Sequence, residues 1–416
     1  MNHVEYGPYK QQLSDELDFY KATMSQVAYE TNPEAGVTFQ LKNRSEDSLF
    51  AYVDPKQLQA RLDVIAQRGF DHDELAYLST LDDGTKPLFS KEYLAYLEGK
   101  SLPEVTVSVN EFSLDIHVDA SGDWPIATFW ETVAMAEVNE LYFETYVQRH
   151  DINMLDLYDE GDERLSAKIE TLKELPDIKF ADFGTRRHFS YRWQKYVVER
   201  LARELPEQFL GTSNIGLSHD LKMRPIGTFA HEMPMVYAAL ADKQGDSVRA
   251  SHGHMLDDWY ERYGTSLSIA LTDTFGSDFF FADFGAERAI AWKGVRHDSG
   301  DPIAFGEKTI AFYAQHGVDP STKTIVFSDG LDIDSIISIY EHFKGRLKSS
   351  FGWGTTLTND VGFKTLSLVV KATEANGHKT TKLSDNLAKA TGDPKTRERA
   401  IKLASYTRNF FQECQV

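Results

Sequence analysis

Short apolar runs alternate with helix-like stretches over the C-terminal part of the chain. From about residue 175 each run ends in a turn rich in Gly, Asp, Ser and Thr, and a stretch with helical spacing follows it. Apolar runs of this length between turn residues are typical of buried strands. The predicted strands are 178–184, 224–231, 266–276, 289–301, 323–330 and 349–357. Consecutive strand and helix units predict an α/β fold.

The clearest helical pattern lies between the last two predicted strands, over residues 332–344. It begins with Asp332, a residue type that caps helix N-termini. Large apolar side chains recur at helical spacing on one side: Ile333, Ile336, Ile337, Tyr340 and Phe343. A stripe of this kind is expected to pack against a sheet.

Parallel strands joined by helices either close into a barrel or form an open, doubly wound sheet, and periodicity alone does not choose between the two. In both architectures the turns at the carboxyl ends of the strands gather on one face, where such folds place their chemistry. We therefore expect the functional residues at the strand ends.

Composition bounds the domain count and the partners. With 416 residues, of which 41% are hydrophobic, the chain can bury a large core and is long enough for two domains. Its formal net charge of -20 would repel phosphate backbones and anionic lipid, so we expect neither a nucleic-acid nor a membrane partner.

The single cysteine, Cys414, leaves no intramolecular disulfide and fits a reducing compartment. No apolar run has the length of a signal peptide or a membrane span, and we expect a cytoplasmic protein.

Three aspartates lie at the ends of predicted strands: Asp273, Asp298 and Asp329. Each alone is more typical of a helix cap or a turn. Converging carboxylates are costly unless they meet a cation, either a metal ion or a cationic transition state. Arg296 belongs to the same turn as Asp298, in Gly294–Asp301, where carboxylates could hold a ribose hydroxyl or Mg²⁺ while the arginine binds a phosphate.

Two further segments are suited to anions. Arg186 and Arg187 follow a predicted strand and a glycine, and guanidinium groups bind carboxylate and phosphate in bidentate fashion. A solvated pair at a helix start is the simpler interpretation. The GWGTT segment, residues 352–356, offers backbone N–H groups and two hydroxyls that could hold a phosphate. A tight turn without a ligand explains this segment equally well.

His231 is the candidate nucleophile, at the end of the predicted strand 224–231. A neutral imidazole can attack phosphorus, act as an acid or base, or bind a ligand, although a lone histidine is more often structural. His252 and His254 are two residues apart, a spacing that suits a strand but not one face of a helix, and no third metal ligand accompanies them. The sequence therefore assigns no metal ligands.

Together these motifs resemble those of nicotinate phosphoribosyltransferases. They occur in the order seen in that family, over about residues 13–390: YKATMSQ, FGTRR, GTSN, GTFAHE, TDTFG, VRHDSGD, FSDGLD, FGWGTTLTND and KLSD. The resemblance implies an irregular, incomplete (β/α) barrel, residues 126–364, and an α/β sandwich domain, residues 1–125 joined by about 365–416, as in type II phosphoribosyltransferases. It also implies a homodimer in which Tyr20 serves the partner's active site.

The resemblance implies a reaction. Nicotinate, 5-phosphoribosyl 1-pyrophosphate, ATP and water would give nicotinate mononucleotide, pyrophosphate, ADP and phosphate, with Mg²⁺, as the first step of NAD salvage from nicotinate. His231 matches the histidine that ATP phosphorylates. Phe183 and Tyr20 match the aromatic residues that sandwich the pyridine ring.

The same resemblance assigns the other site residues. Positions around the phosphoribosyl group and the ring are matched by Arg186, Arg296, Asp273, Asp298 and Asp329, and we expect the three aspartates to be catalytic. Arg187 and Ser299, beside these positions in the sequence, are further predicted substrate-binding residues. Gly354 and Thr355 match the site of the 5′-phosphate. Nicotinamide-using relatives carry an acid at the position of Ser213, so serine there favours nicotinate. After KLSD the family often continues Ser-Pro-Gly-Lys, whereas this chain has Asn-Leu-Ala-Lys, and the role of Lys389 stays open.

Three alternative functions stay open. A phosphoribosyltransferase acting on nicotinamide or quinolinate would share the fold. A barrel hydrolase would use two strand-end aspartates as acid and base, or a metal held by His252 and His254. A non-catalytic phosphosugar-binding protein would need the arginines and glycines but not His231.

Overall fold

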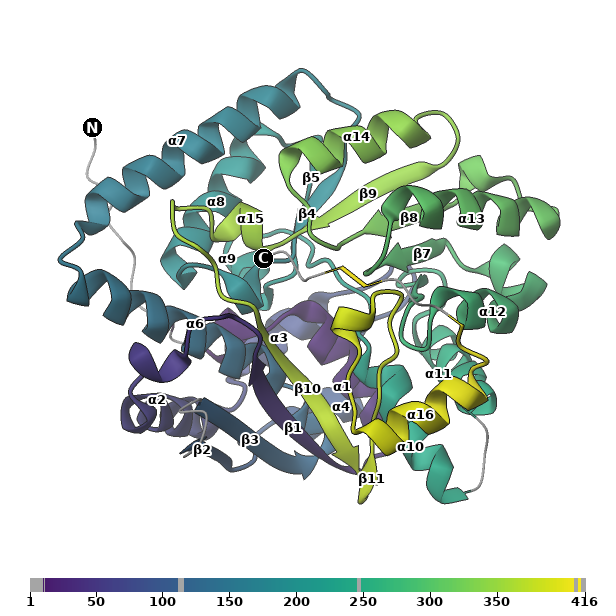
Figure 1. Cartoon of the computed structure of the whole chain (residues 1–416), viewed down its shortest axis with the longest axis horizontal. Helices are drawn as coiled ribbons and strands as arrows, with labels where there is room; N and C mark the ends of the chain where they lie inside the picture. The colour runs from purple at the N-terminus through teal and green to yellow at the C-terminus, as the bar shows by residue number, and fades with distance from the viewer. Residues whose placement is uncertain (1–9, 11, 111–115, 245–247, 408–410, 413–416) are drawn as a thin grey trace.

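Two β-sheets of different kinds organise the chain (Figure 1). The structure is a computed structural model, and it describes residues 10, 12–110, 116–244, 248–407 and 411–412. The result is the mixed α/β, two-domain architecture that was predicted, with an incomplete barrel and a sandwich. Within the described residues, no helix is long and apolar enough to span a bilayer.

The first sheet is parallel and six-stranded. Its spatial order is β5 (Phe209–Thr212), β4 (Phe180–Asp182), β9 (Lys348–Trp353), β8 (Thr324–Phe327), β7 (Gly294–His297) and β6 (Ile269–Leu271). The described ladders end at β5 and β6, so the barrel is not closed by hydrogen bonds there. Helices lie around this sheet in Figure 1: α7 (Met154–Lys173), α8 (Tyr191–Glu204), α11 (Val248–Tyr263), α12 (Ser277–Ala291), α13 (Pro302–Gln315) and α14 (Ile333–Phe343).

The second sheet is antiparallel and joins the two ends of the chain. Its order is β11 (His378–Lys379), β10 (Leu368–Ala375), β1 (Gly36–Asn43), β3 (Ile116–Asp123) and β2 (Val105–Val109). Figure 1 shows the N-terminal strand β1 beside the C-terminal β10. The remaining helices are α1 (Phe19–Thr31), α2 (Pro55–Arg68), α3 (His72–Thr80), α4 (Lys91–Leu97), α5 (Trp124–Ala127), α6 (Trp130–Arg149), α9 (Ile215–Asp220), α10 (Glu232–Gln244), α15 (Thr355–Thr358) and α16 (Pro394–Leu403).

Helix α6 connects the two layers. It is buried from Trp130 to Phe143 and packs against β1 and β10 as well as the turn Thr185–Arg187 at the barrel mouth. The predicted catalytic segment 126–364 thus begins with a helix that also belongs to the sandwich layer.

The C-terminal segment has two parts. Strands β10 and β11 join the antiparallel sheet. Residues 380–393, which we call the C-terminal strap, instead lie against the ends of the barrel strands, where Leu383 N–H donates to the carbonyl of Thr274 at 2.8 Å. Apolar contacts hold the strap and α16 in place: Phe275, Phe279, Leu383, Ala400 and Ala404.

The predicted strand 224–231 is wrong. The segment has no regular secondary structure and pairs in no described ladder, and isolated hydrogen bonds hold it, such as the Ile226 N–H bond to the Thr212 carbonyl at 2.9 Å. Gly227 lies so close to α1 that a Cβ there would be 3.1 Å from the backbone nitrogen of Tyr20. The strand of the parallel sheet that the prediction missed is the short β5.

Two other predictions meet different outcomes. The strand predicted for 289–301 begins only at Gly294, because 289–291 form the end of α12, which restarts at a kink at Gly285. Helix α14 is confirmed. Asp332 caps it through a 2.8 Å bond from Ser335 N–H, and Ile336, Tyr340 and Phe343 are buried.

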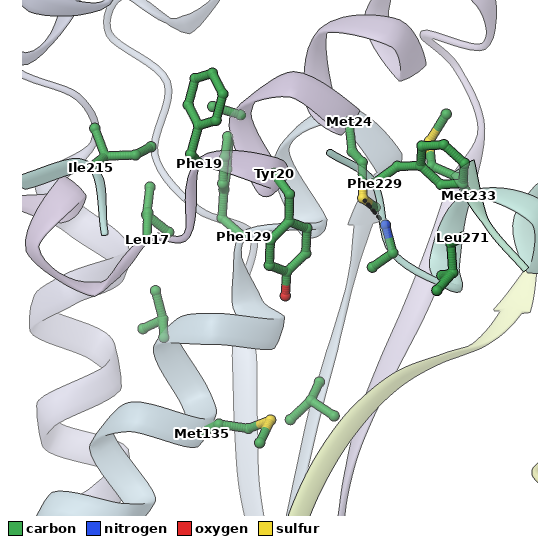
Figure 2. Packing of buried hydrophobic residues seen from close by; sticks show 14 of the residues in the cluster. Leu17, Phe19, Tyr20, Met24, Phe129, Met135, Ile215, Phe229, Met233 and Leu271 are labelled. Carbon is green, nitrogen blue, oxygen red and sulfur yellow. Dashed lines mark hydrogen bonds between the residues drawn. The ribbon is translucent and has the colours of Figure 1, made fainter. Parts of the chain in front are cut away.

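Packing in the hydrophobic core fixes the position of the residues that come just before helix α10. Figure 2 shows Tyr20 and Met24 of α1 among the buried side chains that include Phe229 and Met233. The Ala230 N–H contacts the Met24 sulfur at 3.2 Å. The residue between Ala230 and α10 is His231, so the core fixes its backbone.

Candidate active site

A cavity of about 330 Å³ opens at the carboxyl ends of the parallel strands, against the sandwich sheet. Nine of the predicted site residues line it: Phe183, Arg186, Arg187, His231, Arg296, Asp298, Asp329, Gly354 and Thr355. The other four are buried behind the lining: Tyr20, Ser213, Asp273 and Ser299. The strand-end prediction is confirmed for the aspartates, which follow β6, β7 and β8. It is wrong for His231, which stands at the start of α10.

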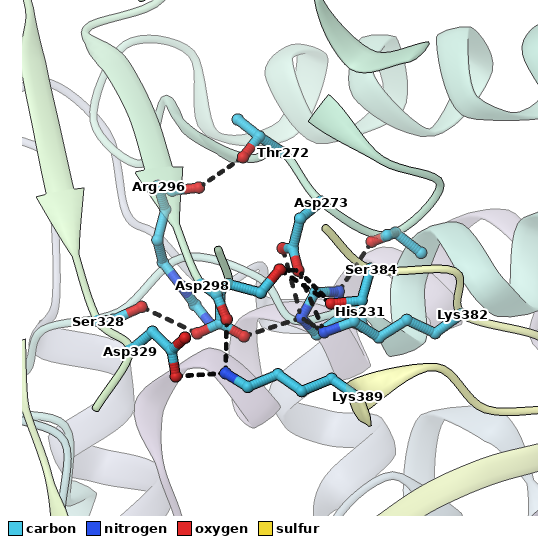
Figure 3. A network of polar contacts seen from close by, with 12 residues as sticks. His231, Thr272, Asp273, Arg296, Asp298, Ser328, Asp329, Lys382, Ser384 and Lys389 are labelled. Carbon is cyan, nitrogen blue, oxygen red and sulfur yellow. Dashed lines mark hydrogen bonds and ion pairs between the residues drawn. The ribbon is translucent and has the colours of Figure 1, made fainter. Parts of the chain in front are cut away.

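The imidazole of His231 is held from both sides (Figure 3). Its Nδ1 lies 2.9 Å from the Thr274 hydroxyl, and its Nε2 lies 2.9 Å from Asp298 Oδ2 and 2.7 Å from Lys382 Nζ. Burial and the positive charge of Lys382 lower the pKa of His231 to about 4. At neutral pH the ring is therefore uncharged and has a lone pair available for chemistry.

The two nearest carboxylates are ionised. Asp273 accepts from the Ser299 hydroxyl at 2.5 Å, and its Oδ1 is buried without a hydrogen-bond partner in the structure. Asp298 contacts Arg296 at 3.3 Å and accepts from the Ser328 hydroxyl at 2.9 Å. Burial alone would raise the pKa of both groups, but the adjacent cations outweigh burial and hold both below their usual range.

One cluster could hold a divalent cation. Ligand atoms of His231, Asp273 and Asp298 lie within 4.8 Å of one another. The buried oxygen of Asp273 that lacks a partner fits a cation ligand, and carboxylate oxygens are what Mg²⁺ prefers. His252 and His254 do not form a second site, because both lie on α11, where His252 pairs with Asp283 and His254 is exposed.

At the other end of the cavity, Phe183 and Arg186 follow β4. The Phe183 ring lies against Gly352, where a Cβ would be only 2.3 Å from the ring, so β9 needs glycine there. The Arg186 guanidinium bonds Glu131 at 2.8 Å and lies 5.5 Å from the Tyr20 ring centroid. These contacts bring an aromatic face and a fixed positive charge together.

Tyr20 belongs to this same cluster in its own chain, and its role at a partner's site stays a prediction. Its hydroxyl donates to Glu131 of its own chain at 3.3 Å. Two contacts at the start of α1 hold Tyr20 in this position: Phe19 N–H donates to the Ser213 carbonyl at 2.6 Å, and Asp18 forms a bridge with Asn214. They attach the N-terminal segment to the end of β5 in the same subunit.

Ser213 acts through a neighbour. Its hydroxyl donates to Asp18 at 2.5 Å, and the other oxygen of Asp18 lies 3.4 Å from the Arg186 guanidinium. Ser213 therefore influences the charge around Arg186 from behind the lining.

Cations from both ends of the chain complete the lining, and strand-end reasoning missed them: Arg44, Lys371 and Lys382. Burial and the neighbouring cations lower the pKa of Arg187 to about 10 and that of Lys371 well below its ordinary value. Clustered cations whose pKa values fall in this way are suited to an anionic ligand. The signal that could have found Lys382 was the KLSD motif, in which it is the lysine.

Lys389, whose role the sequence left open, reaches the site in spite of the altered residues before it. Its ammonium donates to Asp329 and, at 2.9 Å, to the carbonyl of Asp298. It therefore bridges the ends of β7 and β8.

A barrel mouth with two neighbouring carboxylates, a neutral histidine and converging cations is suited to an enzyme that acts on an anionic substrate. Comparison with known proteins identifies which kind. Residues 178–407 match the Nicotinate phosphoribosyltransferase (NAPRTase) family, and residues 16–139 match the N-terminal domain of that family. The chain belongs to the nicotinate phosphoribosyltransferase family.

Solved structures agree. A nicotinate phosphoribosyltransferase from Porphyromonas gingivalis is 30% identical, with a TM-score of 0.85 over 95% of this chain and 100% of that one. The enzyme from Vibrio cholerae is 31% identical, with a TM-score of 0.86 over 97% and 95%. A putative nicotinate phosphoribosyltransferase from Saccharomyces cerevisiae is 27% identical, with a TM-score of 0.82 over 96% and 99%.

Proposed function

We propose that this enzyme couples phosphoribosyl transfer onto nicotinate to ATP hydrolysis through a phosphohistidine at His231, as the entry of nicotinate into NAD salvage. The observation that carries the proposal is that a neutral imidazole lines the same cavity as Arg186, Arg296 and Asp298. One cavity then serves both phosphoryl and phosphoribosyl transfer. We further propose that the enzyme works as a homodimer in the cytoplasm.

The pyridine ring is assigned to the end of the cavity near Phe183. The nicotinate carboxylate pairs there with the Arg186 guanidinium, and Phe183 and Tyr20 contact the ring. Bidentate pairing with arginine both orients the carboxylate and favours it over a neutral carboxamide. This orientation directs the ring nitrogen toward the sugar.

The phosphoribosyl group is assigned to the strand ends. Gly354 and Thr355 hold its 5′-phosphate at the start of α15, and Arg296 binds the pyrophosphate. As the bond from the sugar C1 to pyrophosphate breaks, the carboxylates of Asp298 and Asp329 stabilise positive charge on the ring. The carboxylates of Asp273 and Asp298 would hold Mg²⁺, which when bound supplies positive charge for the phosphate groups.

The test is nicotinate mononucleotide formation from nicotinate and phosphoribosyl pyrophosphate, with and without ATP, for the wild type and for His231→Ala. Product formation that ATP enhances only when His231 is present would support the proposal. Turnover of nicotinamide or quinolinate in place of nicotinate would contradict the substrate, and no pyrophosphate from any of the three would contradict the transferase. ATP stimulation that persists in His231→Ala would contradict the phosphohistidine.

A further inference from the structure

The C-terminal strap places the buried side chain of Lys382 beside His231, the candidate nucleophile. Lys382 is only 3% exposed, although it comes from the far end of the chain. Its backbone is fixed by bonds to Thr391 on the same strap, with N–H to carbonyl distances of 3.2 and 2.9 Å in the two directions. The next residues are anchored to the barrel, where the Ser384 hydroxyl donates to that of Ser299 at 2.8 Å. The position of Lys382 is thus set by the fold.

Two neighbours compete for the same nitrogen of His231. Lys382 Nζ lies 2.7 Å from Nε2, and Asp298 Oδ2 lies 2.9 Å from it. An ammonium can only donate, so its contact requires a lone pair on Nε2, whereas Asp298 requires a hydrogen there. With the lone pair on Nε2, the hydrogen sits on Nδ1 and faces the Thr274 hydroxyl at 2.9 Å. Lys382 therefore favours the tautomer whose lone pair points to the cavity.

The positive charge of Lys382 would also matter once His231 is phosphorylated. A phosphoryl group brings about two negative charges at neutral pH. On His231 it would stand beside the carboxylates of Asp273 and Asp298. Arg296 is paired with Asp298 at 3.3 Å, and Lys389 is paired with Asp329. Lys382, which is also 3.3 Å from Asp273, is the described cation in direct contact with Nε2.

We propose that Lys382 is a catalytic residue of the ATP half-reaction and binds the phosphoryl group on His231. The inference rests on the proposed phosphohistidine. In the step, Lys382 first moves its hydrogen bond from Nε2 to an oxygen of the γ-phosphoryl group, which frees the Nε2 lone pair. The lone pair then attacks the γ-phosphorus of ATP, and the bond from phosphorus to the bridging oxygen breaks with its electron pair leaving on ADP. A flexible lysine stem permits this change without movement of the strap.

The experiment measures single-turnover labelling of the full-length enzyme with γ-³²P ATP and Mg²⁺, quenched in base. Lys382→Met should label about 10²–10³-fold more slowly, as expected when one charged donor to a transition state is lost. Label formed on this variant should also be lost faster after ATP is removed. Lys382→Arg keeps the charge and should recover at least about tenfold of the rate, which a purely structural role would not predict. The control is Lys379→Met on the same C-terminal segment, where Lys379 is exposed and pairs with Glu374 at 2.8 Å; it should label like the wild type.

The outcomes separate the two proposals. If the wild type takes up no label, the phosphohistidine fails and this inference fails with it. If the wild type is labelled and Lys382→Met is labelled at the same rate, the inference alone fails. Should Lys382→Met be unstable in thermal melting, Lys382→Arg decides: a folded Lys382→Arg that labels no faster than the His231→Ala background contradicts the inference.

Discussion

Two walls of the same cavity are built from charged residues in different ways. The inner wall consists of Glu131 and Glu232, which line the cavity, and of Lys21, which does not line it. Lys21 is fully buried, bonded to Glu131 and 2.5 Å from Glu232. The Trp124 indole and the Thr128 hydroxyl also donate to Glu232, at 2.6 and 2.7 Å.

The strand-end wall consists of four lining residues and of Asp273, which is buried behind them: His231, Asp298, Arg296 and Lys382. The hydrogen bonding of its polar groups is less complete. The Asp298 side chain is 22% exposed, and Asp273 Oδ1 and Arg296 Nε are buried without a hydrogen-bond partner in the structure. Polar groups that are saturated by the protein stabilise one arrangement, whereas unsatisfied ones can bind a ligand. We infer that the inner wall mainly maintains the fold and that the strand-end wall performs the chemistry.

The largest expected effect is a loss of stability when the buried ion pairs of the inner wall are removed. Lys21→Met leaves Glu131 and Glu232 without the cation they share, and removing one partner of a buried ion pair costs about 3–5 kcal/mol. Denaturant unfolding should show this loss, and Lys91→Met, at an exposed position on α4, should leave the free energy of unfolding unchanged. A loss below about 1 kcal/mol in Lys21→Met, as for a surface pair, would contradict the role of this wall.

A substitution in the strand-end wall should instead reduce catalytic activity more than stability. Asp298→Asn removes a charge that contacts both His231 and Arg296, and we expect kcat/KM for phosphoribosyl transfer to fall about 10²–10³-fold. The free energy of unfolding should fall by less than in Lys21→Met, because the Asp298 side chain is 22% exposed whereas Lys21 is fully buried. Asp63→Asn, exposed on α2, is the matched control. Equal losses of stability in Asp298→Asn and Lys21→Met would remove the distinction between the walls.

A pH titration of stability tests the raised pKa of Asp182, the buried carboxyl group at the end of β4. Asp182 is fully buried and accepts from Gly184 N–H, Gln194 and Thr212, yet burial outweighs these bonds and raises its pKa to about 6. A raised carboxyl pKa means that its contribution to stability is full below the unfolded pKa near 4 and is lost as pH rises through about 6. The wild type should therefore lose about 2 kcal/mol relative to Asp182→Asn between pH 4 and pH 7. Parallel stability curves for the two proteins would show that Asp182 has an ordinary pKa.

The smallest effect concerns substrate choice. Ser213→Asp places a second carboxylate beside Asp18 and so weakens the positive field of Arg186. We expect kcat/KM for nicotinate to fall about tenfold while that for nicotinamide does not fall. Ser213→Asn, which has a similar shape and no charge, should keep the nicotinate rate within about threefold. Identical behaviour of the two variants in a paired substrate assay would exclude an electrostatic role for this position.

The sequence predicted the strand-end wall better than the inner wall. Five of the six barrel strands and α14 could be found because apolar runs and turn residues are local signals, and parallel strands bring their carboxyl ends together. Strand β5 was missed because four residues with a glycine carry little pattern. Lys21, Glu131 and Glu232 meet only through tertiary packing across the chain, so no local signal reveals their pairing. The position of Lys382 at the site likewise depends on how the C-terminal strap packs against the barrel, which no local pattern in the sequence reveals.

The most direct test of the account is the location of the phosphate after incubation of the wild-type enzyme with ATP and Mg²⁺. Peptide mapping by mass spectrometry under basic conditions should find an acid-labile phosphate on His231, which disappears when nicotinate and phosphoribosyl pyrophosphate are added and product is released. ATP-stimulated product formation with no phosphate on His231, or with phosphate on another residue, would contradict the central claim.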